Sequence, residues 1–358
     1  MIFYDLPYRF RGALIIKSIM HRRTFFLICQ FRHKQVFLRQ IKQIFVKETK
    51  NYFLILLMIA AFAVFNPSPE IPEGKVAGQI VSGTEKFADF PVVPDTRVIS
   101  IPVNAKPAKA PGVSAKAVLI KDIESGVAVY EKNSAEKLPI ASLTKLMTAL
   151  IVVENASLDD EVEIKASDLQ TAPYRINFAV GDRVAIKDLL TAMLVPSAND
   201  AALALARHTF GSKEDFVKAM NNKARGLGMV STSFANPVGF DSASHYSTAA
   251  DMSLLAEEFI KHTELLDIVK LKSADIASLS SSRKQRVYTT NKLLLERDDV
   301  VGLKTGYTVE AKGSLITLVD NGNPESPLRY YSIMLGSDDR EMETRMLMKW
   351  IEDNFIWR

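Results

Sequence analysis

The stretch IASLTKLMTAL, residues 140–150, places a lysine inside an apolar run. Between Ser142 and Val153, Lys145 is the only charged side chain. Pro139 marks a helix start, and in that helix Ser142 and Lys145 share one face because they stand three residues apart. An unpaired ammonium in an apolar setting costs several kcal/mol or gives up its proton. The stretch therefore predicts a buried helix whose lysine has a chemical use.

A serine three residues before a buried lysine is a candidate nucleophile with its own base. A serine hydroxyl reacts poorly until a base removes its proton. Burial lowers the pKa of a lysine, so its neutral amine can be that base. The same S-x-x-K spacing also begins at Ser134 and at Ser281, in charged or serine-rich surroundings where a solvated lysine costs nothing. We interpret those two matches as chance and Ser142 with Lys145 as the candidate pair.

A second polar group precedes an alanine-rich run, in the sequence VPSAND at residues 195–200. Taken alone, Ser197 or Asp200 reads as the N-cap of a helix. The functional interpretation needs the hydroxyl of Ser197 and the amide of Asn199 to point into one cleft. There the hydroxyl would relay a proton, and the amide would hold the lysine and a substrate carbonyl.

A third group lies in GLKTGY, residues 302–307, which reads as a strand. A lysine beside a threonine hydroxyl, as at Lys304 and Thr305, suits a carboxylate. Gly306 lets another group approach the backbone closely. The alternative is an ordinary edge strand that carries a protective lysine.

The remaining pattern predicts one α+β domain. Apolar runs at 117–120 and 127–130 flank the turn signal ESG and predict a strand hairpin. Further strands are expected at 300–305, 314–318 and 330–335, and helices at 200–208, 216–227 and 340–355. Strand pairs at both ends with helices between them indicate a sheet that joins the two ends of the domain.

The three motifs occur in the order S-x-x-K, S-x-N, K-T-G, and a closely related trio marks penicillin-binding proteins and class A β-lactamases. Over residues 113–358 the sequence resembles the serine D-alanyl-D-alanine carboxypeptidases, which are low-molecular-weight penicillin-binding proteins of the peptidase S11 type. Segments outside the trio share the likeness, among them FVKAMNNKARGLGM, TSFANPVGFD and HYSTAADMSLLA. The resemblance implies a β-lactamase/DD-peptidase-like fold, an α/β sandwich in which helices flank an antiparallel sheet.

The resemblance also assigns roles. It implies that Ser142 is acylated, Lys145 is the base, Ser197 relays a proton to the leaving amine, and Asn199 orients substrate and lysine. Lys304 and Thr305 would hold the carboxylate of the terminal D-alanine, with Arg340 near it. Gly306 and Tyr307 are the other expected substrate-binding residues. The backbone N–H groups of Ser142 and Tyr307 would form the oxyanion hole. No cofactor and no metal is implied.

The basic charge of the chain is confined to its N-terminal part. Residues 1–50 hold 11 Lys and Arg against 2 Asp and Glu, whereas the remainder holds 34 against 39. Nothing in the main body therefore indicates nucleic-acid binding. The single cysteine, Cys29, excludes an intramolecular disulfide and metal sites built from thiolates.

An apolar run, 52–65, follows the basic segment and is closed by asparagine and proline. Its length fits a signal peptide or a short membrane anchor, and no clear cleavage site follows it. We expect residues 1–51 to be a basic cytoplasmic segment and 52–66 an uncleaved transmembrane signal anchor or a signal peptide. Residues 67–112, rich in proline, would be an extracytoplasmic linker to the catalytic domain at 113–358. The protein would then be a single-pass protein of a bacterial cell membrane.

The expected function is removal of the terminal D-alanine from peptidoglycan stem peptides, with β-lactams as covalent inhibitors. A D,D-endopeptidase that cuts peptidoglycan cross-links would use the same residues. A β-lactamase of class A needs a glutamate-activated water, and no Glu-x-x-Leu-Asn segment stands between Ser142 and Ser197. A non-catalytic wall-binding module would not need both a nucleophile and a base.

Overall fold

The computed structural model describes residues 99–171, 174–176, 178–323 and 328–358, all of which lie in one compact unit, residues 93–358. The central sheet contains β2 (Ala117–Asp122), β3 (Ala128–Lys132), β8 (Val300–Thr308), β9 (Lys312–Asp320) and β10 (Arg329–Ser337). The helices are η3 (Ala141–Leu143), α4 (Thr144–Asn155), α5 (Ile186–Leu194), α6 (Asn199–Phe210), α7 (Lys213–Gly226), α8 (Ala249–Phe259), α9 (Thr263–Val269), α10 (Lys292–Glu296) and α11 (Arg340–Asn354). Two-stranded ladders join β1 (Pro102–Asn104) to β11 (Phe355–Trp357), β4 (Glu161–Glu163) to β5 (Arg183–Ala185), and β6 (Ser273–Ala277) to β7 (Lys284–Tyr288).

The sheet has the strand order β3-β2-β10-β9-β8, and every neighbouring pair is antiparallel. Strands from the start of the domain therefore pair with strands from its end, as in β2 with β10. This arrangement confirms the expected α+β class with an antiparallel sheet that joins both ends of the domain. β8 lies at one edge of the sheet, with only β9 as its partner.

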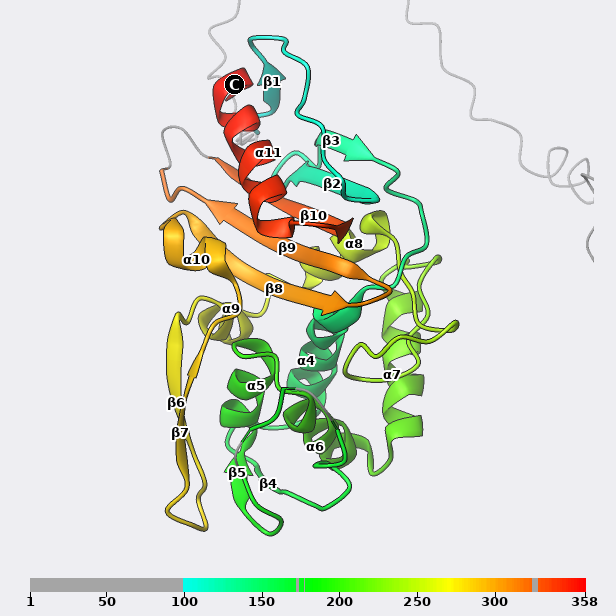
Figure 1. The fold of residues 1–358 in the computed structure, drawn as a ribbon, viewed down its shortest axis with the longest axis vertical. Coiled ribbons are helices and arrows are strands. Elements are labelled where there is room, and N and C mark those ends of the chain that lie inside the picture. The colour runs from blue at the N-terminus through cyan, green and yellow to red at the C-terminus, as the bar shows by residue number, and fades with distance from the viewer. Residues whose placement is uncertain (1–98, 172–173, 177, 324–327) are drawn as a thin grey trace, which may run out of the picture. The chain divides into compact units, whose positions relative to one another are not determined.

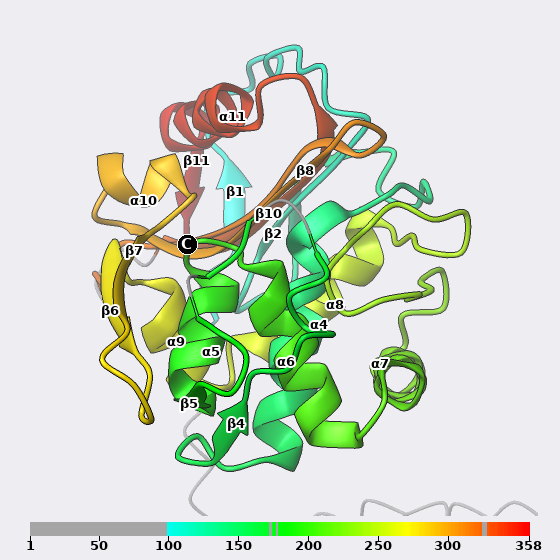
Figure 2. The same cartoon turned by 60° about the horizontal axis from the view of Figure 1, so that its bottom comes forward.

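Helices cover both faces of the sheet (Figures 1 and 2). α11 packs on β9 and β10 from one side, whereas α8 packs on β2 and β10 from the other. Alternation along each strand explains the two layers, because successive side chains point to opposite faces. In β10, Tyr331 and Ile333 belong to the large core on the side of α4, and Tyr330 and Met334 belong to the smaller core under α11.

Local sequence signals explain where several helices begin and end. Side chains at the N-caps of α7, α8 and α11 accept a hydrogen bond from a backbone N–H in the first turn; they are Ser212, Thr248 and Asp339. α6 ends at Gly211, whose φ of +77° favours glycine. The cap at Asp339 starts α11 at Arg340, whose side chain donates to the carbonyl of Gly306 on the edge strand β8.

The structure contains every strand and helix that the sequence pattern predicts between residues 117 and 355. Elements that the pattern left unassigned are α5, α8, α9, α10 and the three two-stranded ladders. One of these ladders begins inside the range expected to be linker, since β1 pairs residue by residue with β11. The segment from 102 to 104 is therefore part of the folded domain.

The predicted cytoplasmic segment and the apolar run at 52–66 lie outside the described residues. Within the part of the chain that the structure describes, no helix combines the length and the apolar character needed to cross a bilayer.

Candidate active site

Ser142 lies at the junction between the sheet and the helical layer. It is the middle residue of η3, a single 3-10 turn that leads directly into α4. The preceding residue, Ala141, is buried and has a φ of +47°, a left-handed conformation that alanine rarely adopts. The predicted helix start is therefore present, but its first turn is tighter than an α-helix and carries backbone strain beside the serine.

Lys145 is completely buried, one turn after the serine. Its Nζ donates hydrogen bonds to Ser142 Oγ at 2.8 Å, to Asn199 Oδ1 at 2.7 Å and to the carbonyl oxygen of Val238 at 3.0 Å. An ammonium has three hydrogens, so these contacts use all of its donors. The contact with Asn199 brings the first and second motifs together.

Burial lowers the pKa of Lys145 to about 7, and the Asp200 carboxylate opposes that shift. Close to half of the lysines are then neutral amines at pH 7. A neutral amine keeps two N–H donors, which Asn199 and Val238 satisfy, and it turns its lone pair toward the hydroxyl of Ser142. The geometry thus fits a lysine that accepts the proton of the serine.

The second motif lies at the start of α6. Ser197 is nearly buried, with a φ of +68°, and Asn199 is the first residue of the helix. Asn199 also donates its backbone N–H to the carbonyl of Tyr174 at 2.8 Å, which ties a loop to this site. Asn199 contacts Lys145 directly, and Ser197 stands two residues before it.

The third motif lies on the edge strand β8. Lys304 is 1% exposed, so it is not the solvent-facing lysine of an ordinary edge strand. Its pKa lies well below the usual range because of burial and, secondarily, the positive charges of Lys145 and Arg340. The Nζ of Lys304 donates to the carbonyl of Thr305 at 3.0 Å, and the Thr305 hydroxyl lies 2.6 Å from that of Thr290. A bound anion would favour the charged form of Lys304.

Two glycines enclose the peptide that precedes Ser142. A Cβ atom on Gly306 would lie 3.0 Å from the backbone nitrogen of Ser142. A Cβ atom on Gly239 would lie 2.0 Å from the carbonyl oxygen of Ala141 and 2.9 Å from the same nitrogen. Real Cβ contacts are not as short as those at Gly239, so that position requires glycine, whereas a side chain at Gly306 would be tight and would need its neighbours to shift. Gly306 brings β8 against the nucleophile, as expected for the K-T-G glycine.

Arg340 connects the last helix to the edge strand. It is the first residue of α11, its side chain is 17% exposed, and its Nη1 donates to the carbonyl of Gly306 at 2.6 Å. Its Nε donates to Glu341 Oε1 at 2.9 Å. Tyr307 follows Gly306 and is 60% exposed. A pocket of about 400 Å³ lies beside them, and Tyr174 and Lys292 also line it.

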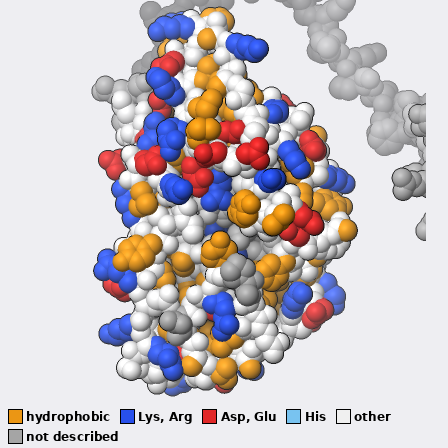
Figure 3. All heavy atoms as spheres, viewed as in Figure 1, with side chains coloured by type: hydrophobic (Ala, Val, Ile, Leu, Met, Phe, Trp, Pro, Cys, Tyr) orange, Lys and Arg blue, Asp and Glu red, His pale blue; other side chains and the backbone are white. Residues whose placement is uncertain are grey.

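The face that holds this site is hollowed near its middle (Figure 3). The hollow lies between the part that carries α11 and the part that carries α5 and α6, where Figure 1 shows β8 and the start of α4. Basic and acidic side chains are interspersed over the part above it. The charge of the surface above the hollow is therefore mixed rather than of one sign.

The sequence analysis gave the loop between α7 and α8 no role in the site. Asn236 Oδ1 accepts the N–H groups of Val238, Gly239 and Phe240, and this turn presents the carbonyl of Val238 to Lys145. A backbone carbonyl has no side-chain signature, so the sequence marks this loop only by the turn signal Asn-Pro-x-Gly.

Asp200 was also read too simply, as an N-cap candidate. It is buried, it accepts the N–H of Ile176 at 2.9 Å, and burial raises its pKa to about 6. It therefore anchors the loop that carries Tyr174 and is the carboxylate that acts electrostatically on Lys145.

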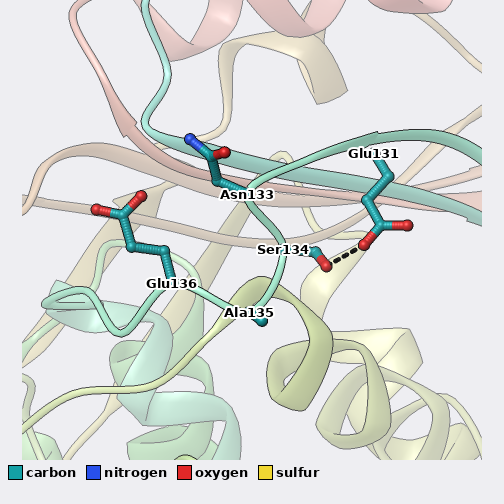
Figure 4. Close-up of a pocket in the computed structure, with 5 residues that line it drawn as sticks. All are labelled: Glu131, Asn133, Ser134, Ala135 and Glu136. Atoms are coloured by element: carbon teal, nitrogen blue, oxygen red, sulfur yellow. Dashed lines mark hydrogen bonds between the residues drawn. The ribbon is translucent and has the colours of Figure 1, made fainter. Parts of the chain in front are cut away.

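The two other S-x-x-K matches form no such pair. Ser134 donates its hydroxyl to Glu131 at the edge of a separate surface pocket of about 470 Å³ (Figure 4), and Lys137 lies 5.0 Å from the ring centre of Tyr246. Ser281 and its lysine lie exposed at the β6–β7 hairpin. The interpretation of both as chance is consistent with these positions.

Among the described residues, Glu154, Glu258 and His262 are the one group whose ligand atoms lie within 4.8 Å of one another. The ammonium of Lys223 bridges the two carboxylates at 2.6 and 3.0 Å. The ammonium of Lys223 therefore supplies the positive charge that a metal ion would otherwise bring to these carboxylates. Glu154 stands near the C-terminal end of α4, whereas Ser142 precedes the first residue of that helix.

Residues 104–328 match the family described as D-alanyl-D-alanine carboxypeptidase, peptidase S11. The D-alanyl-D-alanine carboxypeptidase DacF of Bacillus subtilis is 33% identical over 249 residues, which are 67% of this chain and 62% of the relative. A D-alanyl-D-alanine endopeptidase of Pseudomonas aeruginosa is 34% identical over 203 residues, 55% of this chain and 64% of the relative.

Penicillin-binding protein D2 of Listeria monocytogenes, solved in an ampicillin-bound form, has a similar structure, with a TM-score of 0.59 and 33% identity. That match covers 67% of this chain and 98% of the solved one. The chain thus spans somewhat less than two thirds of the two curated relatives and nearly all of the solved relative.

Proposed function

This chain belongs to the D-alanyl-D-alanine carboxypeptidase family of serine peptidases, and from that premise we propose that it removes the terminal D-alanine of peptidoglycan stem peptides. One observation carries the proposal. The Nζ of the buried Lys145 lies 2.8 Å from Ser142 Oγ and is held there by Asn199 and Val238. This geometry supports the assignment of Ser142 as nucleophile and Lys145 as its base.

In the acylation step, Lys145 in its neutral form takes the proton of Ser142 while Oγ attacks the carbonyl carbon of the penultimate D-alanine. The carbonyl oxygen gains negative charge, and the backbone N–H groups of Ser142 and Tyr307 would donate to it. Such preorganised donors are worth about 3 kcal/mol each in well-studied enzymes. The close approach of Gly306 to the Ser142 nitrogen supports this placement.

The leaving D-alanine carries the free carboxylate that the site would recognise. Lys304, Thr305 and Arg340 are the groups proposed to bind it. A bound carboxylate would favour the charged form of Lys304, whose pKa is otherwise held low by burial. When the C–N bond breaks, the leaving amine takes a proton from the ammonium of Lys145, and Ser197 is proposed to relay it.

Deacylation reverses the roles. A water molecule gives a proton to neutral Lys145 and attacks the ester carbonyl, and Ser142 Oγ leaves with that proton. The products are the shortened peptide and the regenerated serine, so atoms and charge balance over the cycle.

Two measurements test the proposal. Labelling with a fluorescent penicillin should mark the unmutated protein and should be lost in Ser142→Ala, and an unlabelled parent would instead favour a non-catalytic wall-binding module. Incubation with a pentapeptide should release free D-alanine, detected by chromatography. No release at protein concentrations that titrate the penicillin would contradict carboxypeptidase activity.

A D,D-endopeptidase is the second candidate, because a relative of that description is 34% identical. Its chemistry would use the same residues, and the difference would lie in the leaving group. A cross-linked muropeptide offered beside the pentapeptide separates the two, since an endopeptidase yields two peptides and no free D-alanine.

We further propose that the domain acts outside the cytoplasm, where its substrate is found, and that residues 52–66 anchor it. Expression of the whole chain in bacteria, followed by fractionation, tests the anchor. Release of the protein in the soluble extracytoplasmic fraction would support cleavage of that segment instead.

A further inference from the structure

Thr144 and His245 form a buried polar pair directly behind the candidate nucleophile. Thr144 is the first residue of α4, and His245 lies on the loop that leads to α8. Both are at most 1% exposed. His245 Nε2 lies 2.7 Å from Thr144 Oγ1, and Thr144 Oγ1 lies 2.8 Å from the carbonyl oxygen of Ala141. None of these groups has a part in the mechanism described above.

The direction of each hydrogen bond in this chain follows from one backbone contact. The N–H of Ala235 lies 3.0 Å from His245 Nδ1 and can only donate, so Nδ1 accepts. Burial lowers the pKa of His245 to about 4, so the ring is neutral at pH 7 and carries its one proton on Nε2. Nε2 therefore donates to Thr144 Oγ1, and the hydroxyl hydrogen of Thr144 is directed to the carbonyl of Ala141.

The carbonyl of Ala141 and the N–H of Ser142 belong to one planar peptide group. In a trans peptide these two bonds point in opposite directions, so a group that fixes the carbonyl also fixes the N–H. The peptide follows a residue with a φ of +47°, a conformation that persists only where the surroundings hold it. The backbone N–H of Thr144 also donates to this carbonyl, and Gly239 lies against it.

We propose that Thr144 and His245 are positioning residues that hold the Ala141–Ser142 peptide so that the Ser142 N–H points toward the developing oxyanion. This inference rests on the proposed function, because it assigns a role within the same acylation step. The proposed role differs from packing because the hydroxyl of Thr144, rather than its methyl group, holds the peptide in this orientation.

The direct test compares Thr144→Val with Thr144→Ser. Valine keeps the shape but removes the hydroxyl, whereas serine keeps the hydroxyl. The saturating first-order rate of acylation by a penicillin and its apparent dissociation constant are measured separately by rapid mixing. We expect Thr144→Val to lower the rate about tenfold, less than full loss of an oxyanion donor, and to leave the dissociation constant within about twofold. Thr144→Ser should restore most of the rate.

Thr191→Val is the matched control. Thr191 is also buried in a helix, and its Oγ1 donates to the carbonyl of Lys187 at 2.8 Å, but it belongs to α5 and has no contact with the peptide before Ser142. Thermal denaturation should show similar destabilisation in Thr191→Val and Thr144→Val. Only the latter should acylate slowly.

Variants at His245 keep the inference testable if Thr144→Val does not fold. An asparagine can place its oxygen near Nδ1 and accept from Ala235, but it lacks the donor to Thr144. A glutamine can place its amide nitrogen near Nε2 and donate. We expect slow acylation in His245→Asn and near-normal acylation in His245→Gln. The double variant of His245→Asn with Thr144→Val should be no slower than either single variant, because both break one chain of contacts.

Several outcomes would overturn the inference. Acylation by Thr144→Val at the parent rate would show that the hydroxyl is not needed. Slow acylation that serine does not restore, or an additive double variant, would show that packing is responsible. An unlabelled parent protein would contradict the proposed function itself and is distinguished by that control.

Discussion

Gly239 lies directly against the carbonyl oxygen of Ala141, which a Cβ atom at that position would approach to 2.0 Å. The loop that holds the ammonium of Lys145 through Val238 is therefore in contact with the peptide that precedes Ser142. The base and the oxyanion donor are positioned by the same short turn. A disturbance of that turn should affect both functions together.

Gly239→Ala is expected to abolish labelling by penicillin and to destabilise the fold by more than about 2 kcal/mol, because a backbone atom is in the way and φ is +97°. Gly211→Ala is the control, since Gly211 also has a positive φ, of +77°, but has nothing within 4 Å of the added methyl group. It should cost about 1 kcal/mol and keep full labelling. Normal labelling by Gly239→Ala would contradict the described contact.

The rate of acylation should depend on pH through Lys145. The amine must be neutral to take the proton of Ser142, and its pKa is lowered to about 7 by burial. The acylation rate should therefore rise about tenfold per pH unit below pH 7 and level off above it. Because Lys304 interacts with Lys145, the profile reports the titration of the pair. A rate that stays constant from pH 5 to pH 9 would exclude Lys145 as the base.

Asp200→Asn should shift the pH at which the acylation rate rises. The carboxylate of Asp200 favours the charged form of Lys145, so its removal lowers the lysine pKa and shifts the rise in rate to lower pH. Asp188→Asn is a fitting control, because Asp188 also accepts a backbone N–H, that of Ala277, but lies on α5. A shift in both variants, or in neither, would argue against an electrostatic role for Asp200.

Arg340→Ala should weaken recognition of the free carboxylate of a substrate. The expected loss in kcat/KM is about tenfold for a peptide that ends in a carboxylate and much smaller for the same peptide with a terminal amide. Arg345→Ala serves as the comparison, since Arg345 lies on the same helix, pairs with Glu296 and is 45% exposed. Equal losses for acid and amide would mean that Arg340 acts only through its contact with Gly306.

β-Lactams should acylate Ser142 and be released slowly. Fast release in class A β-lactamases depends on a glutamate-activated water, and the sequence between Ser142 and Ser197 lacks the segment that supplies it. A chromogenic cephalosporin should therefore give one rapid equivalent of product followed by a very slow phase. Sustained hydrolysis at hundreds of turnovers per second would make this prediction wrong.

Residue spacing and chemistry were sufficient to select three candidate residues that the structure brings into contact. Ser142 and Lys145 could be found because a charged side chain stands out in an apolar helix, and Asn199 because a second polar motif precedes a buried helix. The strands at both ends of the domain were also predictable, because each is a short apolar run bounded by turn signals.

Other parts of the site have no such signal in a single sequence. Val238 contacts Lys145 through its backbone carbonyl, which every residue type possesses. His245 cannot be distinguished in the sequence from a histidine that only fills the core, because its contact with Thr144 is visible only in the fold. The β1–β11 ladder joins residues about 250 positions apart, and its short strands carry little periodicity. Such features depend on tertiary contacts rather than on local pattern.

The β1–β11 ladder also has a mechanical consequence. Ile101 and Arg358 exchange two backbone hydrogen bonds, at 2.8 and 3.1 Å, which extend the ladder by one residue pair. A force on the entering segment would open this ladder from its end, one residue pair at a time. Those bonds would have to separate before the connection from β1 to β2 could be pulled straight.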